Sequence, residues 1–138
     1  MPTVYAIDYG TSNSLLAGAK DRDPFAPIPL DATNSDATIL RSIMYSPKKG
    51  EWHFGNAAID HYTKNVAEGR LLRSIKKYLP DQSFEGTTIN NQRLKLHDII
   101  ALFLQEMRNR AGEQRQEDVT HAVMGPREAT FGSFFQAC

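Results

Sequence analysis

The stretch AIDYGTSNSLLAGA, residues 6–19, decides how this chain begins to fold. Residues 3–8 carry β-branched and aromatic side chains in an alternating pattern, which predicts a strand. Residues 14–19 are again apolar and predict a second strand. The residues between them are a glycine and short polar side chains, which are typical of a turn, so we expect a β-hairpin. One acid, Asp8, interrupts the apolar pattern at the end of the first strand.

Beyond the hairpin, strand-like and helix-like segments follow one another. Residues 20–38 hold several prolines and polar residues and predict a loop with one short extended piece. Further elements are expected as strands at 41–46, 51–55, 92–96 and 118–125 and as helices at 56–65, 70–79 and 97–112. Asn56 suits an N-cap, and Gly112 stands where the residue after a helix C-terminus is expected. This order of elements predicts an α/β fold.

The strongest of these helices is 97–112, because its apolar residues fall on one face. These residues are Ile100, Phe103, Leu104, Met107 and Ala111. We expect that face to be part of the hydrophobic core rather than a binding site.

The composition argues against several classes of protein, namely nucleic-acid-binding, membrane-spanning and secreted ones. The chain has 138 residues, and its 16 Lys and Arg balance its 16 Asp and Glu, so a large basic field for nucleic acid is absent. No stretch approaches the roughly 20 continuous apolar residues of a membrane span. The N-terminus lacks the pattern of a secretion signal. The single cysteine, Cys138, cannot form an internal disulfide, and we expect a cytoplasmic protein.

The polar turn has two possible roles, and composition alone leaves both open. The first is chain reversal and nothing more. The second is phosphate binding, because Gly10 allows close approach of the backbone while Thr11, Ser12 and Asn13 add donors without bulk. In that role Asp8 would hold a magnesium ion, through water, so that the ion offsets the charge of both groups.

The opening stretch also resembles the first phosphate loop of the actin-like ATPase superfamily, most closely that of the 70-kDa heat-shock chaperone family. Members of that family read like I-D-L-G-T-T-N-S followed by small apolar residues. The matching residues here are Ile7, Asp8, Gly10, Thr11, Asn13 and Ser14. Tyr9 and Ser12 are mild departures.

Later blocks continue the resemblance in the same order. TILRSIMYS is similar to the family's T-x-P-S segment, with Arg41 where proline is usual. HFGNAAIDHYTKN resembles its I-G-x-A-A block, with Gly55, Ala57 and Ala58 in register. LLRSIKKYLP is similar to D-A-K-R-L-I-G, which puts Lys76 on the family's lysine near the γ-phosphate and Lys77 on the following arginine. VTHAVMGPREATF is similar to V-T-x-A-V-x-T-V-P-A-Y-F, although Gly125, Pro126 and Arg127 depart from it.

The resemblance implies that residues 1–138 are the N-terminal lobe of a two-lobed nucleotide-binding domain with a ribonuclease-H-like core. ATP and Mg²⁺ would be its cofactors: Asp8 would organise Mg²⁺, Gly10 to Asn13 would cradle the β- and γ-phosphates, and Lys76 would balance charge. Partners would be ATP and ADP, the second lobe of the same domain, and a client polypeptide or co-chaperone of the parent. The D-x-G-G-G-T loop that such ATPases also need does not occur here, and the apolar ending TFGSFFQAC suggests a chain cut from a longer one. We therefore expect ATP hydrolysis in the full-length parent and little activity in this piece alone.

An alternative from another class is a Holliday-junction resolvase-like nuclease, a single ribonuclease-H-like domain that begins with a similar D-Y-G motif. Such an enzyme needs clustered carboxylates that bind two metal ions about 4 Å apart. The candidate partners of Asp8 would be Glu106, Asp118 and Glu128, none of which lies in a recognisable motif. Thr11, Ser12 and Asn13 stand where the nuclease motif has a Lys-Arg pair, which favours the phosphate cradle. A sugar-kinase-like lobe shares the first loop but not the later blocks.

Overall fold

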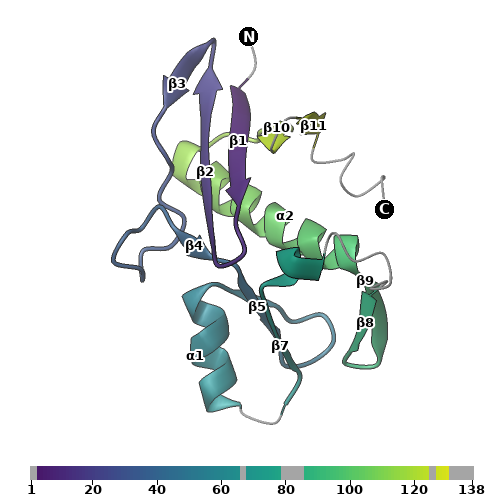
Figure 1. The fold of residues 1–138 in the computed structure, drawn as a ribbon. Coiled ribbons are helices and arrows are strands. Elements are labelled where there is room, and N and C mark those ends of the chain that lie inside the picture. Colours follow the sequence, from purple (N-terminus) through teal and green to yellow (C-terminus); the bar gives the residue numbers. More distant parts are fainter. Residues whose placement is uncertain (1–2, 66–67, 79–85, 125–126, 131–138) are drawn as a thin grey trace.

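Strands and helices of this chain form a mixed α/β arrangement, as the sequence predicts (Figure 1). The computed structural model describes residues 3–65, 68–78, 86–124 and 127–130. Its elements are β1 (Thr3–Tyr9), β2 (Asn13–Lys20), β3 (Asp23–Phe25), β4 (Leu40–Arg41), β5 (Ile43–Ser46), β6 (His53–Phe54), α1 (Asn56–Lys64), β7 (Arg70–Arg73), the 3-10 helix η1 (Ile75–Tyr78), β8 (Gly86–Ile89), β9 (Gln92–Lys95), α2 (Leu96–Arg115), β10 (His121–Met124) and β11 (Arg127–Thr130).

The main sheet has the strand order β11-β10-β1-β2-β3, with β4 added to β2. The predicted hairpin is confirmed, because β1 and β2 pair antiparallel from Thr3 opposite Lys20 to Tyr9 opposite Ser14. β10 lies parallel to β1 on its other side. A short β3 (Asp23–Phe25) is the extended piece expected within the loop.

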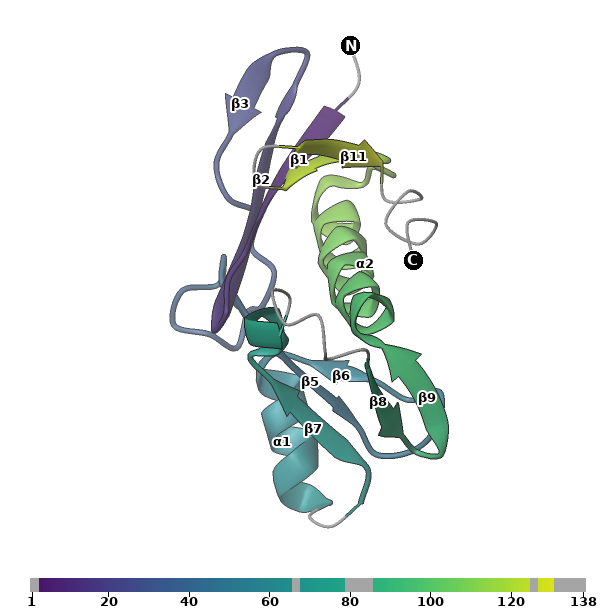
Figure 2. The same cartoon turned by 45° about the vertical axis from the view of Figure 1, so that its right-hand side comes forward.

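Helix α2 covers one face of this sheet (Figure 2). Along β1 the side chains of Tyr5, Ile7 and Tyr9 are buried, whereas those of Ala6 and Asp8 are exposed. This alternation follows from the pleat of a strand, which sends successive side chains to opposite faces. Tyr9 stacks on Phe103 of α2 with the ring centroids 5.5 Å apart, so the buried side of β1 is the side that faces α2. Asp8 therefore lies on the opposite face.

The predicted apolar face of α2 is confirmed, since all five residues named for it are buried. The predicted end of the helix is wrong, because α2 continues through Gly112 to Arg115 and ends where Gln116 takes a left-handed conformation (φ 55°). Gly112 is required for close packing rather than for ending the helix. A Cβ there would lie 2.9 Å from the carbonyl oxygen of Glu117 as the chain turns back toward β10.

A smaller sheet, β6-β5-β7, packs with α1 at the other end of the molecule (Figure 1). The helix predicted at 70–79 is wrong over residues 70–74, and residue 79 lies outside the described residues. Residues 70–73 form β7 paired with β5, and Ser74 (φ 54°) separates β7 from the short helix η1. The helix predicted at 56–65 is confirmed as α1, but its N-cap is Gly55 (φ 66°), a backbone conformation that favours glycine, and Asn56 is its first residue.

The segment predicted as one strand at 41–46 is divided between the two sheets. β4 ends at Arg41 in the main sheet, and β5 begins at Ile43 in the smaller one. Ser42 lies between them and is buried. The strand predicted at 51–55 is confirmed as the shorter β6, and the one at 92–96 as β9, which pairs with β8.

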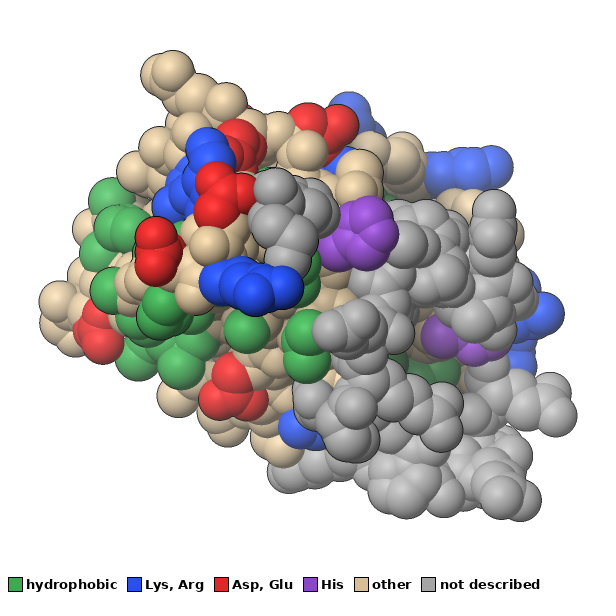
Figure 3. Space-filling view, turned by 90° about the horizontal axis from the view of Figure 1, so that it is seen from above, with side chains coloured by type: hydrophobic (Ala, Val, Ile, Leu, Met, Phe, Trp, Pro, Cys, Tyr) green, Lys and Arg blue, Asp and Glu red, His purple; other side chains and the backbone are tan. Residues whose placement is uncertain are grey.

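The remaining predictions concern the C-terminal part of the chain. Of the strand expected at 118–125, His121–Met124 forms β10, and residue 125 lies outside the described residues, as does the ending 131–138. Seen from the end that carries the β2–β3 turn, acidic and basic side chains are interspersed (Figure 3). Lys20 at the end of β2 forms an ion pair with Glu117 at 2.8 Å. Among the described residues, no helix has both the length and the apolar composition that a membrane crossing requires.

Candidate functional site

The turn between β1 and β2 is tight, and a glycine is required to make it. The N–H of Gly10 donates a hydrogen bond to the carbonyl oxygen of Asn13 at 3.0 Å. A Cβ on residue 10 would lie 2.3 Å from that same oxygen, so any larger residue would force the turn open. The predicted phosphate loop, Gly10 to Asn13, is therefore a compact turn with Thr11 and Ser12 at its tip.

Two buried serines, Ser14 and Ser42, support this turn through hydrogen bonds. The N–H of Ser42 donates to the carbonyl oxygen of Ser12 at 2.9 Å, and its hydroxyl donates to the carbonyl oxygen of Gly10, also at 2.9 Å. The hydroxyls of Ser42 and Ser14 lie 2.8 Å apart and are hydrogen-bonded to each other. Within the part of the chain that the structure describes, the N–H groups of Thr11 and Ser12 donate to no acceptor. The carbonyl oxygens of Gly10, Ser12 and Asn13 thus accept hydrogen bonds, and the N–H groups of Thr11 and Ser12 are available.

Removing the hydroxyl of Ser42 is expected to loosen this turn. Ser42→Ala leaves the carbonyl of Gly10 and the buried hydroxyl of Ser14 without that partner, which should lower the free energy of unfolding by about 1–2 kcal/mol. Urea unfolding measures the loss, and Ser35→Ala, at an exposed position, is the control. An unchanged free energy of unfolding would contradict the structural role of the Ser42 hydroxyl.

Asp8 lies beside this turn on the sheet face that α2 leaves free. It is exposed and stands opposite Leu15 of β2. A depression of about 310 Å³ surrounds it, lined by Ala6, Ile7, Asp8, Leu15, Ala17, Pro27 and Val123. Asp8 is the charged residue of that lining. Its neighbour Tyr9 points into the core, where burial raises the pKa of the phenol to about 12.

Lys76, the predicted charge-balancing residue, lies on η1. This short helix lies beside the β1–β2 turn in both ribbon views (Figures 1 and 2). Its preceding residue, Ile75, is buried in the same core cluster as Tyr9, whereas Lys76 is exposed. The fold therefore brings the element that carries Lys76 close to the turn, although that element is not the helix expected from the sequence. Lys77 follows in η1, and its side chain is outside the described part.

The carboxylates that the nuclease alternative requires are not brought together among the described residues. Glu106 on α2 pairs with Arg110 at 2.8 Å, and Asp118 pairs with Arg108 at 2.5 Å. α2 covers the face of the sheet that Asp8 does not occupy. The described residues contain no group of three or more His, Cys, Asp or Glu able to hold a metal ion. Glu128 belongs to β11, and its side chain lies outside the described part.

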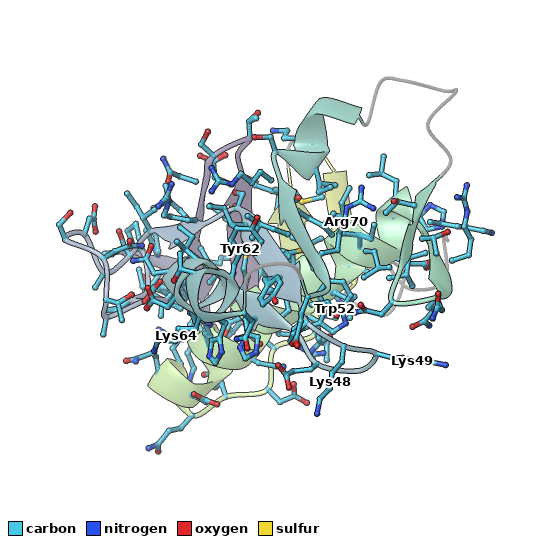
Figure 4. The ribbon with its side chains drawn as sticks, turned by 90° about the horizontal axis from the view of Figure 1, so that it is seen from below. Lys48, Lys49, Trp52, Tyr62, Lys64 and Arg70 are labelled. Atoms are coloured by element: carbon cyan, nitrogen blue, oxygen red, sulfur yellow. The ribbon has the colours of Figure 1, made fainter. Side chains whose placement is uncertain are left out.

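Basic and aromatic side chains also gather at the end of the smaller sheet (Figure 4). Trp52 packs against the hydrophobic core. Arg70 donates to the hydroxyl of Thr87 at 3.0 Å, and Lys48 lies 4.0 Å from Glu51. Glu51 also accepts a hydrogen bond at 2.9 Å from His53, which lowers the pKa of the Glu51 carboxyl. These contacts connect neighbouring strands and turns and give this end a structural role.

Comparison with models of known protein families finds none that matches this chain. The resemblance to the 70-kDa heat-shock chaperones thus rests on the motifs quoted above. The strongest of these motifs, residues 6–19, coincides with the β1–β2 hairpin and the turn Gly10–Asn13.

Proposed function

We propose that this chain is the N-terminal lobe of a two-lobed ATPase that holds the phosphates of Mg²⁺-bound ATP at the turn Gly10–Asn13. The proposal rests on the turn that Ser42 holds by hydrogen bonds. Its N–H groups at Thr11 and Ser12 are unengaged among the described residues, and the exposed carboxylate of Asp8 lies beside it. Successive N–H groups directed into one concavity form an anion-binding site, and phosphate is the anion that such turns commonly hold.

The residues present fit a magnesium nucleotide. Mg²⁺ is commonly bound through one or two carboxylates together with substrate phosphates and water, so the single carboxylate of Asp8 is sufficient. When bound, the ion supplies positive charge to the phosphates. Asp8 would hold the ion in place, and the N–H groups of Thr11 and Ser12 would orient the phosphate. Lys76 on η1 would provide a point charge at the transferring phosphoryl group.

Several finer features belong to the same proposal. The mixed sheet would be the ribonuclease-H-like core of an actin-type ATPase lobe, and the second lobe would close the nucleotide cleft in a cytoplasmic parent protein. ADP would be the product, and a client polypeptide or co-chaperone would be the partner of the parent. ATP hydrolysis would require both lobes, because one lobe supplies only part of the contacts to the phosphates.

A nucleotide titration followed by ¹H–¹⁵N NMR tests the proposal on the 138-residue chain. We expect Mg²⁺-ATP to shift the amide signals of Thr11 and Ser12 with a Kd on the order of 1 mM, since half of a cleft binds weakly. Mg²⁺ alone is the control, and it should affect Asp8 without saturating the two amides. If ATP up to about 10 mM moves neither amide signal, the phosphate-binding role of the turn is wrong.

A further inference from the structure

Arg41 stands directly beside the turn, although it is distant from it in the sequence. The strand β4 consists of Leu40 and Arg41 and pairs with β2, so that Arg41 lies opposite Asn13. Residues opposite each other in an antiparallel pair project from the same face. Asn13 and Leu15 share a face of β2, and Asp8 lies opposite Leu15. Arg41 therefore projects from the same face as Asp8, on the other side of the turn.

The backbone of Arg41 is held on both sides. Leu40 before it is fully buried in the core, and Ser42 after it is buried and bonded to the carbonyls of Gly10 and Ser12. With ideal sheet spacings, the Cα atoms of Asp8 and Arg41 lie about 12 Å apart across β2. A negative and a positive side chain thus flank one turn at fixed positions.

The guanidinium of Arg41 is exposed and forms no hydrogen bond or ion pair within the described residues. By contrast, Arg110 pairs with Glu106, and Arg108 pairs with Asp118. Arg41 thus offers a planar fork of donors next to the two unengaged N–H groups of the turn. A phosphoryl group complements this set, because guanidinium binds phosphate oxygens in a bidentate manner.

We propose that Arg41 is a phosphate ligand of the Gly10–Asn13 turn, opposite the metal-binding side at Asp8. This inference rests on the proposed function and extends it to a residue at which the resembling family usually has proline. The ligand class is a phosphoryl group, which a nucleoside triphosphate or an inorganic polyphosphate could supply. Arg41 would bind from the β4 side, so the phosphate would lie between a cation of the protein and a cation held by Asp8.

The test compares Arg41→Ala with the wild-type chain by ¹H–¹⁵N NMR titration with Mg²⁺-ATP and with Mg²⁺-tripolyphosphate. We expect Arg41→Ala to raise both Kd values by roughly 10- to 100-fold, which is the effect of losing a charge-assisted pair of hydrogen bonds. Arg41→Lys should recover only part of the loss, because an ammonium lacks the fork geometry. Arg93→Ala is the matched control, since Arg93 is exposed on β9 in the separate β8–β9 sheet.

The outcomes separate this inference from the proposed function. If the wild-type chain binds ATP and Arg41→Ala binds it equally well with unchanged spectra elsewhere, the role of Arg41 is overturned while the nucleotide site stands. If the binding of ATP and of tripolyphosphate both depends on Arg41, its role as a phosphate ligand stands for a phosphoryl group from either source. If neither ligand binds the wild-type chain, both proposals are overturned.

Discussion

Phe103→Ala should lower the free energy of unfolding by about 3–5 kcal/mol, the usual cost of deleting a large buried aromatic side chain. Phe103 is 1% exposed and lies where three parts of the core meet. Its ring stacks on Tyr9 of the main sheet at 5.5 Å between centroids and packs edge-on against Phe54 of the smaller sheet at 6.1 Å. The truncation would leave a cavity between α2 and both sheets, and rigid strands on two sides limit how far it can collapse.

Urea unfolding followed by the fluorescence of Trp52, which packs against the same core, measures this loss. Phe103→Leu keeps most of the volume and should cost clearly less than Phe103→Ala. Glu113→Ala, at an exposed position of the same helix, should stay within about 0.5 kcal/mol of wild type. A loss below about 1 kcal/mol for Phe103→Ala would mean that Phe103 does not join the two sheets as described.

The second large effect concerns catalysis in the full-length ATPase that we propose contains this lobe. Asp8→Asn keeps the shape of the side chain and removes its charge, so it should reduce ATP turnover by about 100-fold or more through loss of metal positioning. Lys76→Ala should reduce turnover by roughly 10- to 100-fold, because one positive charge near the phosphoryl group is removed. Both residues are exposed, so the thermal unfolding temperature should change little.

Asp60→Asn and Lys64→Ala are the matched controls, since they make the same chemical changes at exposed positions of α1, which packs with the smaller sheet. They should leave turnover unchanged. Steady-state phosphate release with saturating Mg²⁺-ATP provides the measurement. Wild-type turnover in both Asp8→Asn and Lys76→Ala would refute the roles proposed for them, whereas loss in one alone would refute the role of the other.

Local patterns predicted the parts of the fold whose contacts are local. The β1–β2 hairpin follows from two apolar runs and a polar turn, and the buried face of α2 follows from helical spacing. The helix expected at 70–79 failed because Arg70–Arg73 pairs with β5, which lies far away in the sequence, and this pairing outweighs helical composition. The prediction for Gly112 failed because the same residue serves close packing as well as helix ends.

In the candidate site, too, local features could be predicted from the sequence, and features that depend on distant strand pairing could not. Asp8 and the turn Gly10–Asn13 could be predicted because they are contiguous in the chain. The support from Ser42 and the position of Arg41 could not, since both depend on the pairing of β2 with β4 across a long connection. A single serine such as Ser42 is a weak signal in a sequence, and its partners at Gly10, Ser12 and Ser14 appear only in three dimensions.

The junction of β9 and α2 limits how this chain can change in length. β9 ends at Lys95 and α2 begins at Leu96, so no connecting residue separates them. One inserted residue would turn α2 by about 100° relative to the β8–β9 hairpin, so that the apolar face of the helix and Ile89 of the hairpin could not both keep their places in the core. Insertions and deletions in relatives should therefore be absent from this junction and occur instead in the connection between β3 and β4, where extra residues do not alter the phase of any helix.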